Sequence, residues 1–459
     1  MRTKSSRLEI EGSKRWSQST STVRTRIPSG GGAAALPVRH RRRPLALALA
    51  GGLVALPTVV GAQTLTPPIH EPDDAAGNRK IAGYASIGYE LAGLDVFPEL
   101  AFAARGDSNV FADDTRRRSD IALSLAPKIT ARRLTRSSRT TLEADARISR
   151  FGSLASQDSN EFAASASYTR FAGAGDSITA STSYRREVVQ RGTAENDLPF
   201  GDPLIRRAIQ TAIQGHKRFN RLAIDGAARF VHMRYEEARL GNGLAIDQSF
   251  RNGERYAVQL TASYELSGRT TLFAGGSYDH FDYRMSPALT NRDADAWSAA
   301  AGVSYEVSRV LIAQLALGER QYDFVDPALG RFSGLSIAGQ LRYFPTRLLS
   351  IRGSIEQTST TSPYDLVGAV TLTTARIEGE YEMRRALSWV GKVQFTAEDY
   401  GSKDYSARSL SISAGPRWRL NRWLSAEATL GHDRRFTQGI APFPRYSRTY
   451  ALLTITLAP

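Results

Sequence analysis

Polar and apolar side chains alternate with a period of two residues from about residue 95 to the end of the chain. In the segment 139–150, Leu142, Ala144, Ala146 and Ile148 are apolar, and the residues between them are charged. The segments 256–266 and 424–430 repeat this alternation. A period of two is the signature of a strand whose two faces meet different surroundings. We therefore predict a chain built almost entirely of β-strands.

The spacing of the predicted strands is as informative as their pattern. Short connections, such as 172–175 and 267–268, alternate with longer ones, such as 106–118 and 237–252. Short turns on one rim and long loops on the other are typical of outer-membrane barrels. We predict strands near 95–105, 119–131, 139–151, 159–171, 176–190, 207–219, 221–236, 253–266, 269–284, 293–307, 310–324, 331–344, 347–359, 366–385, 388–399, 405–420, 422–436 and 446–457.

The predicted fold is therefore all-β: a transmembrane antiparallel up-and-down β-barrel of about 18 strands, with 16 also possible. Its short turns would be periplasmic and its long loops extracellular, and an even strand count places both termini on the periplasmic rim. In hydrocarbon every backbone amide must find a partner, so the sheet must close on itself. One segment, 203–214 (PLIRRAIQTAIQ), also fits helical spacing, and both a short loop helix and the base of a strand stay open there.

The N-terminus resembles an export signal. Three arginines, Arg41 to Arg43, precede the apolar run 44–57, and the small residues at 60–62 favour cleavage after Ala62. A transmembrane anchor is the alternative, which Gly and Pro within the run weaken. We predict a signal peptide with an extended N-region at 1–62, a periplasmic linker at 63–94 and an outer-membrane barrel at 95–459.

Charge and composition narrow the function. The net charge of +15 falls to +6 once the +9 carried by residues 1–62 is removed, which leaves little support for nucleic-acid binding. The chain has no cysteine, which excludes disulfides, thiolate metal sites and a cysteine nucleophile. The scattered histidines form no metal-binding motif, and no nucleophile motif of a hydrolase is present. We expect no cofactor, no metal and no enzymatic activity.

Several segments resemble the putative β-barrel porin 2 family, whose members are outer-membrane β-barrel proteins. The resemblance covers roughly residues 95–440 and is carried by GDSNVF at 106–111, LSGRTTLFAGGSYDHFDYRM at 266–285, LGERQYDFVDPALGRFSGLSI at 317–337 and PTRLLSIRGSIEQT at 345–358. It implies a barrel in the outer membrane of a Gram-negative bacterium, and some related barrels accompany exopolysaccharide export. The chain departs from the usual pattern at its end, Leu457-Ala458-Pro459, which lacks a terminal aromatic residue.

Charged residues on the polar faces of two predicted strands are the candidate lumen-facing groups. They either select solutes as fixed charges of a constriction or form cross-strand ion pairs that hold the wall together, and we favour ion pairing for any single residue. These residues are Arg139, Glu143, Asp145, Arg147, Arg376, Glu378, Glu380 and Arg384. Tyrosines and tryptophans near strand ends are expected to form interfacial girdles, with sugar stacking as the alternative.

The sequence thus predicts a porin-like outer-membrane barrel, a passive or gated channel for small solutes. A role in exopolysaccharide export or envelope assembly is the first alternative, and a barrel-embedded lipid hydrolase the second. The expected partners are outer-membrane lipid, the barrel-assembly machinery, and polysaccharide or small anionic solutes. The oligomeric state is left open.

Overall fold

The computed structural model describes residues 84, 86–173, 175–196, 201–284, 290–360, 367, 369–400, 406–439 and 445–459. The chain divides into two units, 1–45 and 46–459, and all described residues belong to the second. The predicted signal peptide, with its cleavage site at Ala62, and the larger part of the predicted linker lie outside the described residues.

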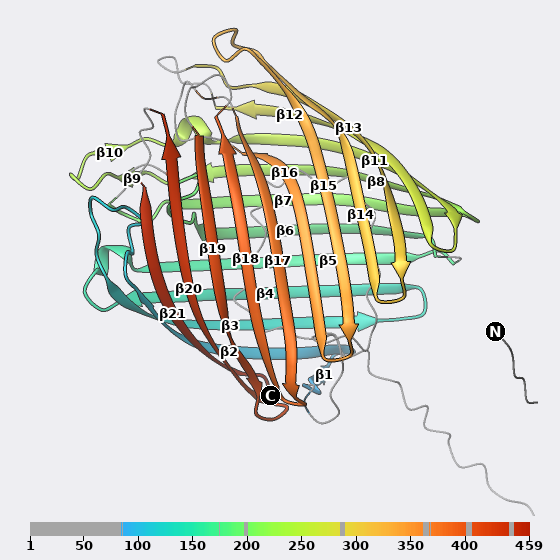
Figure 1. Ribbon diagram of the computed structural model, residues 1–459, viewed down its shortest axis with the longest axis horizontal. Coiled ribbons are helices and arrows are strands. Elements are labelled where there is room, and N and C mark those ends of the chain that lie inside the picture. The colour runs from blue at the N-terminus through green and yellow to red at the C-terminus, as the bar shows by residue number, and fades with distance from the viewer. Residues whose placement is uncertain are drawn as a thin grey trace, which may run out of the picture. The chain divides into compact units, whose positions relative to one another are not determined.

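Eighteen antiparallel strands form a closed barrel, as predicted (Figure 1). Each strand pairs with the next along the chain, and the last strand pairs with the first of the ring, from Leu100 opposite Leu457 to Asp107 opposite Tyr450. The strands are β2 (Leu94–Asp107), β3 (Asp120–Leu134), β4 (Ser138–Phe151), β5 (Ser159–Phe171), β6 (Ser177–Val188), β7 (Ile205–Phe219), β8 (Leu222–Tyr235), β11 (Gly253–Ser267), β12 (Thr270–Tyr283), β13 (Ala294–Ser308), β14 (Leu311–Phe324), β15 (Arg331–Thr346), β16 (Leu349–Thr360), β17 (Val370–Arg384), β18 (Leu387–Asp399), β19 (Ser406–Arg419), β20 (Leu424–Gln438) and β21 (Tyr446–Leu457).

Three short strands and two 3-10 turns complete the described elements. They are β1 (Tyr89–Leu91), β9 (Ala238–Arg239), β10 (Ala245–Ile246), η1 (Ala155–Gln157) and η2 (Ser249–Arg251). Within the described ranges, the structure contains no helix that is long and apolar enough to cross a bilayer.

The connections alternate in length around the ring, which confirms the predicted short turns and long loops. The β7–β8 turn has two residues, and Asn220 adopts a positive φ of 54° there, a conformation that asparagine tolerates better than most residues. On the opposite rim, β6 and β7 are joined by residues 189–204, and β8 and β11 by 236–252. β2 runs from Leu94 towards the long β2–β3 connection, and β21 runs from the long β20–β21 connection to Leu457. Both ends of the ring therefore lie on the short-turn rim.

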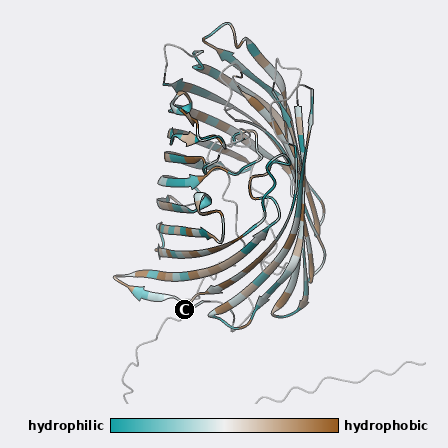
Figure 2. Ribbon diagram, turned by 90° about the vertical axis from the view of Figure 1, so that its left-hand side faces the viewer, coloured by the Kyte–Doolittle hydropathy of each residue, from teal (hydrophilic) through white to brown (hydrophobic). Residues whose placement is uncertain are grey.

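The two faces of the sheet differ as a membrane requires. On β11, Val258 and Leu260 are both 58% exposed, whereas Arg255, Thr261 and Ser263 on the opposite face are buried. Figure 2 shows the corresponding alternation of hydrophobic and hydrophilic colour along the strands. A side chain on the convex face of a closed sheet has only its outer-wall neighbours to cover it, so these buried polar groups lie inside the barrel. The outer face is apolar and suits lipid.

Aromatic side chains mark both edges of the apolar outer face. Tyr264 lies near the short-turn end of β11 and Tyr256 lies eight residues away, towards the long-loop end. That spacing corresponds to about 27 Å along the strand and roughly 20 Å in height at the usual strand tilt. This is close to the height of the apolar band of an outer-membrane barrel.

The structure resolves the local alternatives. Residues 205–214 belong to β7, so the helical spacing of this segment does not produce a helix. Pro345 lies within β15, where the register with β16 becomes irregular between Tyr343 and Thr346; proline lacks the amide needed for a regular ladder. Inside the predicted linker, β1 forms a small hairpin with the start of β2.

Candidate functional site

The connection between β6 and β7 reaches across the inside of the barrel. Its residue Ala194 belongs to a buried apolar cluster with Val367, Val370 and Tyr400, which come from the β16–β17 connection, β17 and the end of β18. In the eighteen-strand ring β6 is the fifth strand and β17 the fourteenth, so they lie on opposite walls. The segment 189–196 folds back on itself, since the side chain of Asn196 donates to the carbonyl oxygen of Val189 at 2.7 Å, and its tip reaches elements of the opposite wall near the long-loop end. We call it the crossing segment.

A second contact fixes the crossing segment to the closing strand. The hydroxyl of Tyr446, on β21, donates a hydrogen bond to the carbonyl oxygen of Gly192 at 3.4 Å. Gly192 has a positive φ of 73°, and a Cβ atom placed there would lie 2.3 Å from Cε1 of the Tyr446 ring. Both the backbone conformation and the close approach of the ring require glycine at this position.

A buried carboxylate ties the crossing segment to its own side of the barrel. Glu195 forms an ion pair with Arg206 of β7 and accepts a hydrogen bond from the hydroxyl of Tyr235 at 2.6 Å. Its backbone carbonyl accepts a hydrogen bond from Arg251 at 2.9 Å, and the Arg251 guanidinium lies 4.0 Å from the centre of the Tyr235 ring. Arg206 also pairs with Glu187 at 2.5 Å. The carboxylates of Glu187 and Glu195 balance the positive charges of Arg206 and Arg251, and buried charges are tolerated where they are paired in this way.

The charges of the crossing segment are set by these neighbours. Burial acts to raise the pKa of Glu195, but Arg206 and Arg251, with the Tyr235 hydroxyl, outweigh it and lower the pKa below its ordinary value. Burial, with the nearby charge of Arg116, lowers the pKa of Arg191 to about 10. Both side chains are still ionised at neutral pH.

Other long connections pack against the crossing segment. Arg191 donates to Gln157 of η1 at 2.9 Å and lies 5.3 Å from the centre of the Phe111 ring in the β2–β3 connection. Arg292, in the β12–β13 connection, donates to the carbonyl oxygen of Val367 at 3.0 Å. In the view from this end, segments of the connections lie within the outline of the strand ring (Figure 2). The long-loop end of the barrel is thus partly filled by connected loops.

Buried ion pairs continue along the inner wall beside the Ala194 cluster. Arg435 of β20 pairs with Glu398 of β18, and the hydroxyl of Tyr400 donates to Glu398 at 3.0 Å. Arg435 also donates to the Tyr400 hydroxyl at 3.2 Å. Tyr400 thus connects the apolar cluster under Ala194 to a charged part of the wall.

The predicted charged residues of β4 take part in cross-strand contacts. Glu143 pairs with Lys128 at 2.9 Å, and Arg147 pairs with Glu161 at 3.3 Å. Asp145 is the backbone partner of Lys128. The guanidinium of Arg139 lies 5.7 Å from the centre of the Phe171 ring.

The predicted residues of β17 behave similarly, but on another part of the wall. Glu378 pairs with Lys392 at 3.3 Å, and Arg376 donates to the side-chain oxygen of Gln394 at 2.7 Å. Glu380 is buried and lies 3.6 Å from Arg417. Arg384 is exposed next to the β17–β18 turn. Since β4 is third and β17 fourteenth in the ring, the structure does not bring the two sets together, and a selective role for them stays a prediction.

Sequence reasoning missed the residues that join the loops to the wall. Glu195 and Arg251 lie in connections without periodic patterning, and Arg206 lies in the ambiguous segment 203–214. Arg229 of β8 was also missed. It lies on the same face as the buried Val231 and Met233, and its buried Nε finds no hydrogen-bond partner among the described residues.

The histidines offer little support for metal or hydrolase chemistry. No group of three or more potential metal ligands occurs in the described ranges. The hydroxyl oxygen of Ser447 lies 3.4 Å from Nε2 of His432, while Nδ1 of His432 lies 2.9 Å from the hydroxyl of Thr449. A hydroxyl stabilises an imidazolium less than the carboxylate of a serine-hydrolase triad does, so this contact gives little support to a hydrolase.

The chain matches one family model, and its similarity to solved outer-membrane proteins is distant. The family model described as "Putative beta-barrel porin 2" matches residues 82–457. Among solved structures, the outer membrane protein OpdK from Pseudomonas aeruginosa is similar at 12% identity and a TM-score of 0.43, over 80% of this chain and 99% of that chain. OccAB3 from Acinetobacter baumannii is similar at 14% identity and a TM-score of 0.43, over 80% and 100% of the two chains. The FrpB iron transporter from Neisseria meningitidis is similar at 10% identity and a TM-score of 0.45, over 79% and 67%. No curated protein matches the chain.

Proposed function

Because this chain belongs to the Putative beta-barrel porin 2 family, we propose that it is an outer-membrane channel for small solutes whose lumen is gated by the crossing segment. The fold supplies a porin-like outer-membrane barrel. The proposal adds that the lumen conducts small solutes and that the crossing segment controls its opening.

The observation that carries the proposal is the contact of Ala194 with the opposite wall. A barrel of this size leaves room for an aqueous lumen unless a segment enters it. The crossing segment enters the lumen, and three contacts hold its tip: Glu195 with Arg206 on the near wall, Ala194 with the cluster of the opposite wall, and Gly192 with Tyr446 of β21. Releasing the far contacts would widen the path and leave the barrel ladder intact.

We further propose that the preferred solutes are small anions. The chain after residue 62 keeps a net charge of +6. Arg229 supplies an inner-face guanidinium without an ion-pair partner in the described part of the chain. An uncompensated fixed cation raises the local concentration of anions. Replacing Arg229 by Gln should shift the reversal potential in a KCl gradient towards cation preference.

The experiment that tests gating is conductance of the purified full chain in a planar bilayer with the crossing segment tethered. Since the sequence has no cysteine, the double variant Ala194→Cys, Val370→Cys can be linked by a short dithiol-specific reagent without side reactions. The linked protein should stay at low conductance, and reducing a cleavable link should restore opening events.

Two results would contradict the proposal. One is a purified, folded barrel that never conducts under any applied voltage. The other is a linked variant whose opening frequency equals that of the unlinked protein. A single-cysteine variant, Ala194→Cys, treated with the same reagent controls for modification alone.

A further inference from the structure

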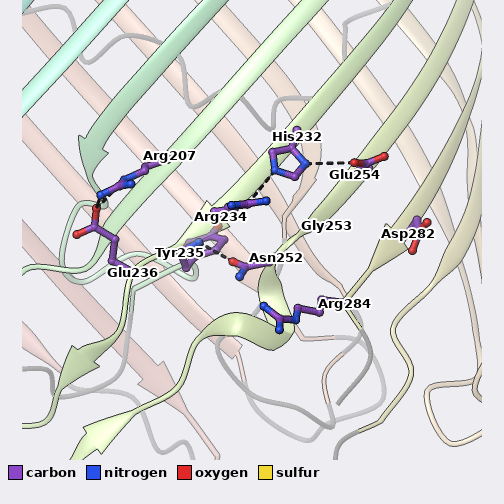
Figure 3. A pocket seen from close by; sticks show the side chains of 10 residues that line it. All are labelled: Arg207, His232, Arg234, Tyr235, Glu236, Asn252, Gly253, Glu254, Asp282 and Arg284. Carbon is purple, nitrogen blue, oxygen red and sulfur yellow. Dashed lines mark hydrogen bonds and ion pairs between the residues drawn. The ribbon is translucent and has the colours of Figure 1, made fainter. Parts of the chain in front are cut away.

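A pocket of about 500 Å³ lies on the outer wall near the long-loop rim (Figure 3), and one of its lining residues, Tyr235, also contacts Glu195 of the crossing segment. It is formed by the ends of β7, β8, β11 and β12 and is largely polar and charged. The buried neighbours of its lining residues on the same strands, such as Arg206 and Met233, face inwards. By the alternation of the strands, Arg207, His232 and Arg234 therefore face outwards. The lining residues are Arg207, His232, Arg234, Tyr235, Glu236, Asn252, Gly253, Glu254, Asp282 and Arg284.

The register of the strands places four arginines in one row across this wall. Arg186 is paired with Arg207, and Arg207 with Arg234, as direct backbone partners. Arg284 follows in the same row, because its amide donates to the carbonyl oxygen of Asn252 at 2.8 Å. Like charges directly opposite one another destabilise a sheet, so such a row needs counter-charges close by.

The chain itself neutralises only part of this row. Glu236 serves both Arg186 and Arg207, at 3.3 and 2.6 Å. Arg234 donates instead to Nε2 of His232 at 3.0 Å, and Nδ1 of His232 lies 3.3 Å from a carboxylate oxygen of Glu254. The side chain of Arg284 forms no hydrogen bond or ion pair among the described residues, although Asp247 in the neighbouring connection is within reach of its charge.

The next rows towards the membrane change character in steps. Directly below the arginines, Glu254 and Asp282 are backbone partners, and Glu254 accepts a hydrogen bond from the hydroxyl of Tyr256 at 2.6 Å. Below them, Phe230 and Tyr256 contact each other with ring centres 5.1 Å apart. Val258 and Leu260 follow in the exposed apolar band. The order is cation, carboxylate, aromatic ring, aliphatic chain.

The height of the arginine row matches a lipid headgroup. Asn252, which lies in that row, is four residues beyond Tyr256 along β11. Four residues correspond to about 14 Å along the strand and about 10 Å in height at the usual tilt. An apolar band of about 25 Å centred between Tyr256 and Tyr264 extends about 2.5 Å beyond Tyr256. The row therefore stands about 7–8 Å outside the hydrocarbon, at the outer limit of a headgroup region of roughly 5–8 Å.

We propose that this pocket binds the phosphorylated saccharide headgroup of an outer-leaflet glycolipid. The unpaired guanidinium groups of Arg234 and Arg284 would bind phosphate, for which the planar fork of arginine is suited. The carboxylates of Glu254 and Asp282 would accept hydrogen bonds from sugar hydroxyls, and the acyl chains would lie along Phe230, Tyr256 and Val258. A second copy of the chain fits less well, since it would bring its own arginine row to the surface. The proposal does not depend on conduction.

The test is binding of lipid A to the purified full chain, measured by native mass spectrometry from detergent. The variant is Arg234→Gln combined with Arg284→Gln. The matched control is Arg331→Gln, an outer-wall arginine at the same rim that pairs with Asp323 at 2.5 Å. Two further arms use lipid A stripped of its phosphates and inorganic phosphate as a competitor. We expect the double variant to bind lipid A at least tenfold more weakly, the control to bind like the parent, and the stripped lipid to bind weakly to all three.

Three results would overturn the proposal: equal binding of lipid A by parent and double variant, equal binding of the stripped lipid, or full competition by millimolar inorganic phosphate. The last would assign the pocket to free phosphate. Dimers of the parent that disappear in the double variant would assign it to a subunit interface. If the double variant does not fold, Arg284→Gln alone replaces it, because that side chain forms no hydrogen bond or ion pair within the described ranges, and it should still weaken binding.

Discussion

The hydroxyl of Tyr446 lies 3.4 Å from the carbonyl oxygen of Gly192, and this contact joins residues 254 positions apart in the chain. It places the crossing segment against β21, the strand that closes the barrel. The part of the crossing segment from Gly192 to Ala194 is thus held by the ring of Tyr446 and by the apolar cluster around Ala194.

The substitution Gly192→Ala should release this contact. The new Cβ atom would lie 2.3 Å from Cε1 of Tyr446, and the positive φ adds about 1 kcal/mol of backbone strain. We expect a larger mean conductance in planar bilayers, with an unchanged barrel as judged by circular dichroism. Gly330→Ala is the matched control, because its φ is also positive and nothing lies within 4 Å of its Cβ position. Equal conductance of both variants and the parent would refute a gating role for the contact.

Acid should weaken the contacts by which Glu195 holds the crossing segment to β7 and β8. The pKa of Glu195 is lowered in the folded state, since Arg206, Arg251 and Tyr235 outweigh the effect of burial. A carboxyl with a lowered pKa stabilises the docked segment fully above its ordinary pKa of 4.5, and this contribution is lost as the pH falls through the lowered value. Conductance should be constant from pH 8 to 5 and rise below about pH 4.

The variant Glu195→Gln tests the same carboxyl at fixed pH. It should conduct at pH 7 as the parent does in acid, and its remaining dependence on pH between 5 and 3 should be small. A parent-like profile of the variant would show that another group controls the acid response. Glu378→Gln, which removes a part-exposed wall carboxylate paired with Lys392, serves as the control.

Arg417 should be among the wall residues most important for stability. It lies between Glu380, at 3.6 Å, and Glu427, at 2.9 Å, and it is buried. Replacing it by Met leaves carboxylates without their cation, which costs on the order of 3–5 kcal/mol for a buried pair. Arg376→Met, where the lost partner is the neutral Gln394, should cost under about 1 kcal/mol. Urea unfolding from phospholipid vesicles, followed by tryptophan fluorescence, measures both, and similar losses would disprove the distinction.

The assignment of the apolar face of β11 to lipid can be tested at Leu260, at the middle of the apolar band. Leu260 lies halfway between Tyr256 and Tyr264 and is well exposed. Arginine at the bilayer midplane costs about 2–4 kcal/mol in an outer-membrane barrel. We expect Leu260→Arg to lower the free energy of folding into vesicles by that amount, and Gln259→Arg, on the other face of β11, to lower it much less. The reverse order would mean that the face towards lipid is wrongly assigned.

The barrel could be predicted because its pattern is local and its closure is a physical necessity. Alternation along β4 or β11 assigns a strand without knowledge of the rest of the chain. In a membrane every backbone amide must be paired, so the sheet of such strands must close into a barrel. The exception, 203–214, shows the limit: Leu204, Ala208 and Ile209 fit a helical period, but pairing with β6 and β8 makes the segment a strand.

The crossing segment and the arginine row could not be predicted in the same way. Gly192 meets Tyr446 through tertiary packing that no local period encodes. Arg186, Arg207, Arg234 and Arg284 are unremarkable along the sequence, and only the register of β6, β7, β8 and β12 sets them side by side. The charged residues of β4 and β17 could be predicted to share one face because each set lies within a single strand.

The pairing of Leu100 with Leu457 has a consequence for biogenesis. The seam between β2 and β21 needs residues 450–457, so the ring stays open until β21 has been made. During that time β2 presents unpaired amide and carbonyl groups over most of its length, an edge prone to joining other chains. A chain whose ring is still open must therefore be kept apart from its copies, and the timing of closure is set by the arrival of β21.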